Sequence, residues 1–555
     1  MEKVWLKNYP DGVPETIDPN EYKSLGDMLL NSIHYFKNRP AYSNLGTSLS
    51  YEDVEILTRN LAAYLTSKAG LNKGDRIAIM MPNLLQYPIA LFAALRAGLV
   101  VVNTNPLYTE RELEHQLNDS GAVAIVILEN FAGTLAHIID KTNVKTVITT
   151  RIGDLAPFPK SFIINFAVKY IKKMVPNFNL PMAVKFNDAI TIGKSEAFED
   201  ANTQHDDIAF LQYTGGTTGV AKGAILTHKN MIANLLQVRA WVSNELKKES
   251  NEIFITALPL YHIFSLTANA FALTLGAKSV LITNPRDMKG FVKELSQEKF
   301  TFMAGVNTLF NGLLNSPGFS QLDFSHVKLF LGGGMAVQEA VALEWQEVTG
   351  HVLIEAYGLT ETSPGVSVNP VNNEKFTGNI GLPVSSTKVC IKDKNGSELA
   401  FNEPGELCVK GPQVMQGYWK RPEETDNVMD SEGWLHTGDI ATIDERGFIT
   451  LVDRLKDLII VSGFNVYPNE VENVVASHPK VMEVGAIGVP HEKSGEAVKL
   501  YVVKKDSDLT EEELKAFCYK EMTRYKCPKY IQFVDILPKS NVGKVLRKDL
   551  RNLEE

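Results

Sequence analysis

The sequence is poor in cysteine, and this scarcity excludes two classes of protein. Its 555 residues contain four cysteines, Cys390, Cys408, Cys518 and Cys527, which are too few and too scattered for a disulfide framework. No Cys-x-x-Cys or His-x3-His spacing occurs, so a structural zinc site is not expected. The cysteine content therefore fits a reducing compartment.

Long hydrophobic runs are also missing. The longest runs, such as residues 122–128, are strand-sized, well short of the roughly 20 residues that span a bilayer. The first ten residues mix charged and apolar side chains, unlike a signal peptide. The weakly apolar stretch 261–283 contains Ser265, Asn269 and Lys278, and we interpret it as a buried helix followed by a strand. The sequence therefore predicts a soluble, cytoplasmic protein.

The chain has no excess of positive charge. It carries 56 Lys and Arg against 65 Asp and Glu, a net charge of −9. No global field therefore draws it to nucleic acid, and we expect no nucleic-acid partner. The hydrophobic fraction of 44% and the charged fraction of 22% are ordinary globular values, which excludes a disordered chain or a coiled-coil rod.

Strand-like and helical patterns alternate through the first 450 residues or so. Residues 76–80, 100–103 and 123–128 are short, β-branched runs, and the segments 84–97 and 110–117 between them have helical periodicity. This alternation predicts an α/β fold with mostly parallel strands.

The pattern changes after Arg454. A helix at 469–478, strands at 484–489 and 497–503, and a helix from the capping box 510–513 to Met522 predict a small α+β unit. We therefore predict a large domain of residues 1–453 and a small one of residues 454–555.

One segment is amphipathic and basic. From Ser161 to Val175, apolar residues recur at helical spacing, and Lys169, Lys172 and Lys173 supply positive charge. Such a helix commonly packs on the protein's own core, but it can also bind reversibly to an anionic membrane surface. Both interpretations stand at this point, the second with the protein peripheral on the inner membrane face.

The strongest local signal is a Gly/Thr-rich loop that follows an apolar strand-like run. Its glycines let backbone N–H groups turn toward an anion, its threonines add hydroxyl donors, and Lys222 adds a positive charge. The loop fits a polyphosphate, although neither the Walker pattern nor Gly-x-Gly-x-x-Gly matches it. Its residues are Tyr213, Thr214, Gly215, Gly216, Thr217, Thr218, Gly219 and Lys222.

This loop resembles the phosphate-binding signature of the adenylate-forming superfamily of acyl-CoA synthetases. Further motifs of that superfamily follow in the expected order: LPLYH at 258–262, GGGM at 332–335, EAYGLTE at 355–361, GWLHTGD at 433–439, DRLK at 453–456 and PKSNVGK at 538–544. The stretches 81–88, 105–108, 111–119 and 461–468 look most like bacterial long-chain fatty acid–CoA ligases, and the resemblance runs nearly end to end.

The resemblance implies a fold and a reaction. The fold would have a large N-terminal domain of mixed and parallel sheets flanked by helices, with a small barrel, and a mobile α+β C-terminal domain. The reaction would join a long-chain fatty acid to coenzyme A through an acyl-adenylate, with ATP and CoA as co-substrates and Mg²⁺ as cofactor.

The resemblance also assigns residues. Lys544 would be the principal cation of adenylation, Glu361 the Mg²⁺ ligand, and His262 a catalytic residue near the reacting carboxylate or a satisfied core histidine. Asp439 would accept both ribose hydroxyls, supported by Arg454, and Tyr357 would contact adenine. The other positions implied in nucleotide binding are Gly332, Gly333, Gly334, Glu355, Ala356, Gly358, Leu359 and Thr360.

The small domain would serve both half-reactions by rotating about Lys456. The stretch expected to border the pantetheine tunnel contains Ser462, Gly463, Phe464 and Tyr467. Two alternatives stay open: a related enzyme that loads a carrier protein or uses a shorter carboxylate, and a non-catalytic nucleotide- or lipid-binding protein. Only eleven residues follow Lys544, so we expect no fused carrier domain. The oligomeric state is left open, a dimer included.

Overall fold

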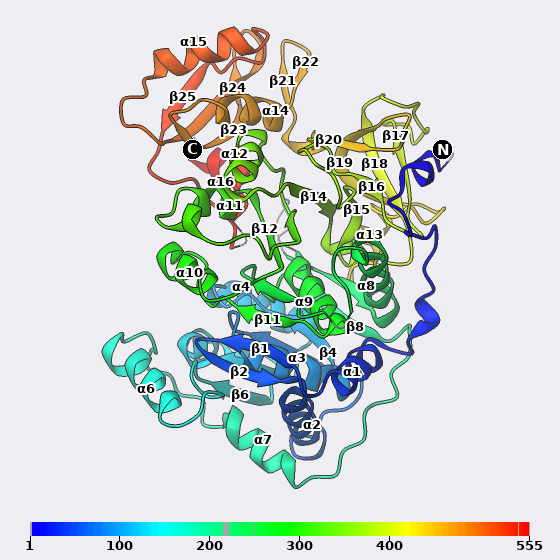
Figure 1. Ribbon diagram of the computed structural model, residues 1–555, viewed down its shortest axis with the longest axis vertical. Helices are drawn as coiled ribbons and strands as arrows, with labels where there is room; N and C mark the ends of the chain where they lie inside the picture. The colour runs from blue at the N-terminus through cyan, green and yellow to red at the C-terminus, as the bar shows by residue number, and fades with distance from the viewer. Residues whose placement is uncertain (1–2, 215–220, 249, 542, 554–555) are drawn as a thin grey trace.

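The computed structural model describes residues 3–214, 221–248, 250–541 and 543–553 (Figure 1). Two large sheets form the body of the molecule. The seven-stranded sheet has the order β7-β6-β5-β3-β4-β8-β9, and the nine-stranded sheet has the order β16-β15-β14-β13-β12-β10-β11-β1-β2. The strands of the first are β3 (Arg76–Met80), β4 (Val100–Asn103), β5 (Ala124–Leu128), β6 (Thr146–Thr150), β7 (Val184–Lys185), β8 (Ile208–Thr214) and β9 (Lys222–Thr227). Those of the second are β1 (Pro40–Asn44), β2 (Thr47–Ser50), β10 (Ile253–Thr256), β11 (Lys278–Leu281), β12 (Phe302–Gly305), β13 (Leu329–Gly332), β14 (Leu353–Gly358), β15 (Gly365–Val368) and β16 (Leu382–Pro383).

Helices flank both sheets, which confirms the predicted α/β class. The central strands β3, β4 and β5 are parallel to their neighbours and almost wholly buried, as expected for apolar β-branched runs covered on both faces. The helices are α1 (Leu25–Tyr35), α2 (Tyr51–Ser67), α3 (Gln86–Arg96), α4 (Glu110–Ser120), α5 (Ala132–Ala136), α6 (Lys160–Phe166), α7 (Phe186–Lys194), α8 (His228–Val242), α9 (Ile263–Leu275), α10 (Met288–Leu295), α11 (Asn307–Leu314), α12 (Glu339–Thr349) and α13 (Pro422–Asp426).

The individual elements predicted here are also confirmed. The expected strands at 76–80, 100–103 and 123–128 are β3, β4 and β5, and the two helical segments between them are α3 and α4. The stretch 261–283 contains α9 followed by β11, both largely buried. None of the described helices is both long enough and apolar enough to cross a membrane.

A third, smaller sheet connects the body to the rest of the chain. Its four antiparallel strands have the order β17-β18-β19-β20. They are β17 (Lys388–Lys392), β18 (Gly405–Lys410), β19 (Leu435–Ile443) and β20 (Ile449–Arg454). The outer strands β17 and β20 are not paired with each other, so these four strands form an open sheet at the place where the resemblance implies a barrel. The last residue of β20 is Arg454, the position at which the sequence pattern changes.

The elements from β21 to α16, here called the C-terminal unit, form a separate five-stranded sheet with helices. Its hydrophobic clusters are distinct from those of the body, and Figure 1 shows its sheet, α14 and α15 above α11 and α12, with α16 beside these two helices. Thr510 caps α15 by accepting the N–H of Glu513, as the capping motif predicts. The elements are β21 (Ile459–Val461), β22 (Phe464–Val466), α14 (Pro468–Ala476), β23 (Val481–His491), β24 (Gly495–Lys504), α15 (Glu511–Glu521), β25 (Tyr530–Phe533) and α16 (Arg547–Asn552).

The amphipathic segment differs from its expected form in two ways. It consists of α6 followed by a π-helical turn, Ala167–Ile171, so the helix ends before Val175. No residue of either piece is buried, so the interpretation that this helix packs on the protein's own core is wrong. Periodicity predicted the apolar face correctly but could not tell whether anything covers it.

Candidate functional site

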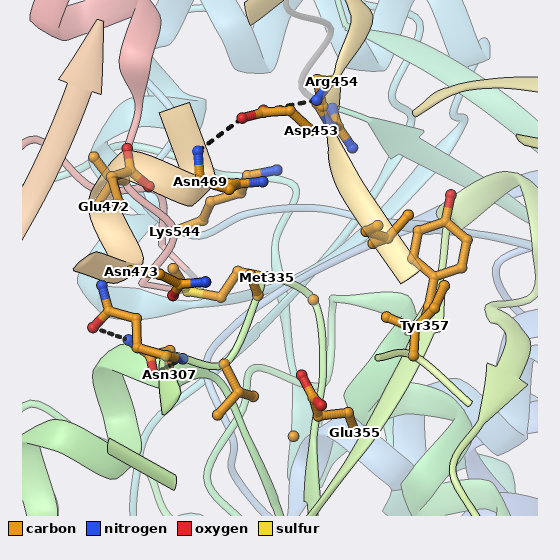
Figure 2. A pocket seen from close by; sticks show the side chains of 18 of the residues that line it. Asn307, Met335, Glu355, Tyr357, Asp453, Arg454, Asn469, Glu472, Asn473 and Lys544 are labelled. Atoms are coloured by element: carbon orange, nitrogen blue, oxygen red, sulfur yellow. Dashed lines mark hydrogen bonds between the residues drawn. The ribbon is translucent and has the colours of Figure 1, made fainter. Parts of the chain in front are cut away.

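A cavity of about 840 Å³ lies between the body and the C-terminal unit (Figure 2). Its walls come from the ends of β13 and β14, from the middle of β19, from β20 and α11, and from the loop that contains Lys544. Ten of the residues singled out from the sequence line it: Gly332, Gly334, Glu355, Ala356, Tyr357, Gly358, Asp439, Arg454, Lys456 and Lys544. The fold therefore brings together positions that lie more than 200 residues apart in the chain.

The glycine-rich and aromatic motifs meet because their strands are neighbours. β13 and β14 are paired in parallel, so the residues at their carboxyl ends reach the same edge of the sheet, where open α/β sheets commonly bind ligands. Gly333 has little room for a side chain, since a Cβ there would lie 3.1 Å from the carbonyl oxygen of Ala356.

Asp439 is held by two side chains of the site. The Tyr357 hydroxyl donates to its Oδ2 at 2.6 Å, and Arg454 Nε lies 3.0 Å from its Oδ1. Asp439 and Arg454 face each other across β19 and β20. Burial, and then the Asp439 carboxylate, raise the pKa of Tyr357 well above its usual value, so the phenol stays a donor. This geometry fixes a buried carboxylate at one end of the cavity.

Glu355 also points into the cavity (Figure 2). It is 7% exposed, and its Oε2 has no hydrogen-bond partner among the described residues. Burial raises the pKa of Glu355 to about 8, so the carboxyl group is mainly protonated near neutral pH and can donate a hydrogen bond.

Lys544 supplies a cation to the same space. Its loop is closed by hydrogen bonds between Ser540 and Lys544: the Lys544 N–H donates to Ser540 Oγ at 3.1 Å, and the Ser540 N–H donates to the Lys544 carbonyl at 2.7 Å. Burial lowers the pKa of Lys544 to about 8, and the charge of Arg454 adds to this effect. An anion in the cavity would raise that pKa again.

His262 lies at the start of α9, where it accepts the N–H of Phe264 at 3.4 Å. Burial, and then the charge of Lys544, lower the pKa of His262 to about 4. The imidazole is therefore neutral at neutral pH, which favours an orienting role over proton donation.

A second cluster holds Lys222 and Glu361 outside the lining of the cavity. Lys222 forms an ion pair with Glu424 and lies 5.2 Å from the centre of the Tyr418 ring, while the Tyr418 hydroxyl donates to Glu361 Oε1 at 2.7 Å. Tyr418 and Glu424 belong to no recognised motif, so neither could be singled out from sequence.

The expected phosphate loop lies partly outside the residues that the structure describes. Gly215, Gly216, Thr217, Thr218 and Gly219 lie outside the described residues. Thr214 ends β8. The Tyr213 side chain is directed elsewhere, since its hydroxyl donates to Asp119 Oδ2 at 2.7 Å, and Arg421 holds the other oxygen of Asp119 at 3.0 Å.

The comparisons with known proteins agree with this geometry. Residues 31–419 match the model of the AMP-binding enzyme family, and residues 470–544 match its C-terminal domain. A long-chain-fatty-acid–CoA ligase of Escherichia coli O6:H1 is 56% identical over all of this chain and 98% of its own length.

Solved structures agree as well. The ATP-bound MatB of Rhodopseudomonas palustris has a TM-score of 0.81 at 29% identity, with 95% of this chain and 98% of that chain covered. The o-succinylbenzoate CoA synthetase of Bacillus subtilis, solved with an acyl-adenylate intermediate, has a TM-score of 0.75 at 26% identity, with 94% and 97% covered.

The chain belongs to the AMP-binding enzyme family. Its adenylate-forming fold, expected from the motifs, is thereby confirmed. In this AMP-binding enzyme the remaining predicted residues that the structure describes do not line the cavity. Leu359 and Thr360 lie just beyond β14, where a 3₁₀ turn, Thr360–Thr362, begins.

The residues expected near the pantetheine do not line the cavity. Ser462 and Gly463 form the turn between β21 and β22, and Phe464 is 58% exposed and stacked on Tyr525 at 4.9 Å. Tyr467 occupies the N-cap position of α14, without a side-chain hydrogen bond to the helix.

The AMP-binding enzyme also has lining residues that sequence reasoning missed. Thr308 and Asn311 on α11, and Arg547 at the start of α16, line the same cavity. Of these three residues, Arg547 could have been found from the sequence, because it closely follows the motif that ends at Lys544.

Proposed function

We propose that this AMP-binding enzyme joins a long-chain fatty acid to coenzyme A, consuming ATP and releasing AMP and pyrophosphate. The observation that carries the proposal is the meeting of Asp439, Tyr357 and Lys544 in one cavity between the body and the C-terminal unit. The identity of 56% to a long-chain-fatty-acid–CoA ligase over the whole chain supports the substrate class.

In the first half-reaction a carboxylate oxygen of the fatty acid attacks the α-phosphorus of ATP. The bond to the bridging oxygen breaks, and pyrophosphate leaves. Lys544 stabilises the negative charge that gathers around phosphorus, because a cation fixed in a partly desolvated cavity acts more strongly than one in water. Asp439 accepts the ribose hydroxyls, and Tyr357 lies against the adenine.

In the second half-reaction the CoA thiol attacks the acyl carbon, its proton passes to solvent, and AMP leaves. We assign the pivot to Lys456, next to the domain boundary at Arg454. Ser462, Gly463 and Phe464 would then approach the cavity, replacing Lys544. A domain closure of this kind keeps water away from the reactive adenylate.

Mg²⁺ is the cofactor we assign to this reaction, with Glu361 as its protein ligand. The fit rests on donor chemistry: a single carboxylate suits a hard dication that keeps water and phosphate oxygens as its other ligands. Glu361 forms no ion pair among the described residues, and the Tyr418 hydroxyl orients its carboxylate. When bound, the ion would neutralise charge on the phosphate oxygens.

The exposed face of α6 and its π turn, here called the α6 patch, supports reversible contact with an anionic lipid bilayer. The exposed fractions of its apolar side chains are 62% for Phe162, 60% for Ile163, 45% for Phe166, 60% for Tyr170 and 70% for Ile171. Lys160, Lys169, Lys172 and Lys173 lie in and beside the same segment. Apolar anchors with adjacent lysines suit an interfacial helix on acidic lipid, where long acyl substrates also partition.

Two vesicle experiments test this contact. Phe162→Ser with Ile171→Ser should reduce cosedimentation with anionic vesicles and leave activity on a soluble short acid unchanged. Replacing the three lysines Lys169, Lys172 and Lys173 by Gln should weaken binding to anionic vesicles only. Equal vesicle binding by both variants and the parent protein would refute the contact.

AMP release tests the proposed reaction itself. With ATP and Mg²⁺, we expect CoA-dependent AMP release that rises from acetate through decanoate to oleate. Pyrophosphate release without CoA-dependent turnover would instead identify another acceptor, such as a carrier protein. A maximum at short chains would refute the long-chain assignment.

A further inference from the structure

Lys544 is held in the cavity by contacts between the C-terminal unit and the body. In the proposed reaction Lys544 enters the cavity for the first half-reaction and leaves it for the second. A contact made only while Lys544 lies in the cavity therefore contributes to its position in the first half-reaction alone. The side chains of Thr308, Asn311 and Arg547 donate polar contacts between the two parts.

The first contact is next to Lys544 in the chain. Thr308 Oγ1, on the first turn of α11, donates to the carbonyl oxygen of Gly543 at 3.0 Å. Gly543 has a φ of +85°, and a Cβ there would lie 2.4 Å from Thr308 Oγ1. The backbone before Lys544 therefore lies directly on the threonine, and only glycine suits this position.

The second contact lies one turn further along α11. Asn311 Nδ2 donates to the carbonyl oxygen of Met482 at 2.9 Å, at the start of β23. The start of α11 is itself fixed to the body, because Asn307 exchanges two hydrogen bonds of 3.0 Å with Gln338 (Figure 2). α11 is thus fixed to the body at its start and has two polar side chains turned to the C-terminal unit.

The third contact follows Lys544. Arg547 Nη1 lies 3.2 Å from Oδ1 of Asp453, which is in β20 just before the predicted boundary, and the same guanidinium is held by Glu472 at 2.8 Å. Both carboxylates are largely shielded from solvent, which makes these charge-assisted bonds strong. Lys544 is thereby flanked by an anchor on each side.

We propose that Thr308 and Asn311 are positioning residues for adenylate formation, acting by docking the C-terminal unit so that Lys544 stays in the cavity. This inference rests on the proposed two-step function. It assigns α11 a role in one half-reaction and none in the other, since the unit must leave α11 before the thioester forms.

Thr308→Val tests the inference, because it removes the hydroxyl and keeps the shape. We expect kcat/KM for fatty-acid-dependent pyrophosphate release to fall about fivefold, the effect of one lost hydrogen bond. Thioester formation from supplied acyl-adenylate and CoA should be unchanged. Thr308→Ser should restore adenylation, and Asn311→Leu should repeat the selective loss.

Ser316→Ala is the matched control. Ser316 lies just after α11, and its hydroxyl donates to the carbonyl of Gly312. Because this bond stays within the body, both half-reactions should keep the parent rate. An equal loss in both half-reactions for Thr308→Val, or no loss in adenylation, would overturn the inference while leaving the proposed function intact. Failure of the parent protein to release pyrophosphate would instead refute the proposed function.

A chemical readout is independent of activity. The rate at which Lys544 is acetylated, followed by mass spectrometry in the full-length protein, should rise in Thr308→Val and stay at the parent rate in Ser316→Ala. An unchanged rate in Thr308→Val would show that the threonine does not hold the unit closed, whatever reaction the enzyme performs.

Discussion

The C-terminal unit has two regions to which we assign a function, and they differ in their position relative to the cavity and in their contacts. The loop of Lys544 lies in the cavity, is closed on itself by hydrogen bonds, and rests on Thr308. The turn of Ser462 and Gly463 lies outside the lining of the cavity, with the neighbouring Phe464 exposed. Under the proposed function, this is the arrangement suited to adenylation, and the turn of Ser462 and Gly463 would act in a different orientation of the same unit.

Lys544→Ala should have the largest effect, and on the first half-reaction alone. We expect adenylation to fall by about 10³-fold, the scale of losing a charge-stabilising group aimed at the transition state. Thioester formation from supplied acyl-adenylate should stay within about twofold of the parent rate, because Lys544 has left the site by then. Quenched-flow measurement of both half-reactions decides the matter, and equal losses would refute the assignment.

Lys456→Pro should have the opposite selectivity. Proline fixes φ, so a pivot at this residue would no longer turn, and thioester formation should fall about 100-fold with adenylation nearly intact. Leu455→Pro serves as the neighbouring control. If Lys456→Pro leaves the two half-reactions in their parent ratio, the pivot lies elsewhere.

Asp439→Asn should slow both half-reactions, because Asp439 belongs to the body and should serve both. Its loss removes a charged acceptor from Tyr357, Arg454 and the ribose, so the KM for ATP should rise about tenfold. The rate from supplied acyl-adenylate should fall by a similar factor. A loss confined to one half-reaction would contradict a shared nucleotide site.

The smallest expected effect is on the pH profile. Lys544 has a pKa lowered to about 8, so its charge is present below that pH and is lost as pH rises through it. The kcat/KM for ATP in adenylation should therefore decline a few-fold between about pH 7.5 and 9. Lys544→Arg should remove this limb, because arginine stays protonated. Persistence of the limb in Lys544→Arg would assign it to another group.

The motifs singled out residues that the fold brings to one cavity, for a physical reason. Gly332 ends β13 and pairs with Glu355 in β14, and this parallel pairing brings the two motifs to one edge of the sheet. What could not be predicted depends on contacts across the chain. Thr308 and Gly543 are 235 positions apart, and no local pattern couples a helix start to a distant glycine. The exposed α6 patch was missed in part for the same reason, since periodicity does not reveal what lies opposite a face.

The ion pair between Lys222 and Glu424 has a consequence for ionic strength. For Lys222 to reach a phosphate group it must first leave a carboxylate, so binding exchanges one negative partner for another and does not neutralise a bare cation. Dissolved salt weakens the old pair as well as the new one. The affinity for nucleotide should therefore depend less on salt concentration than the number of positive side chains near the phosphates alone would indicate.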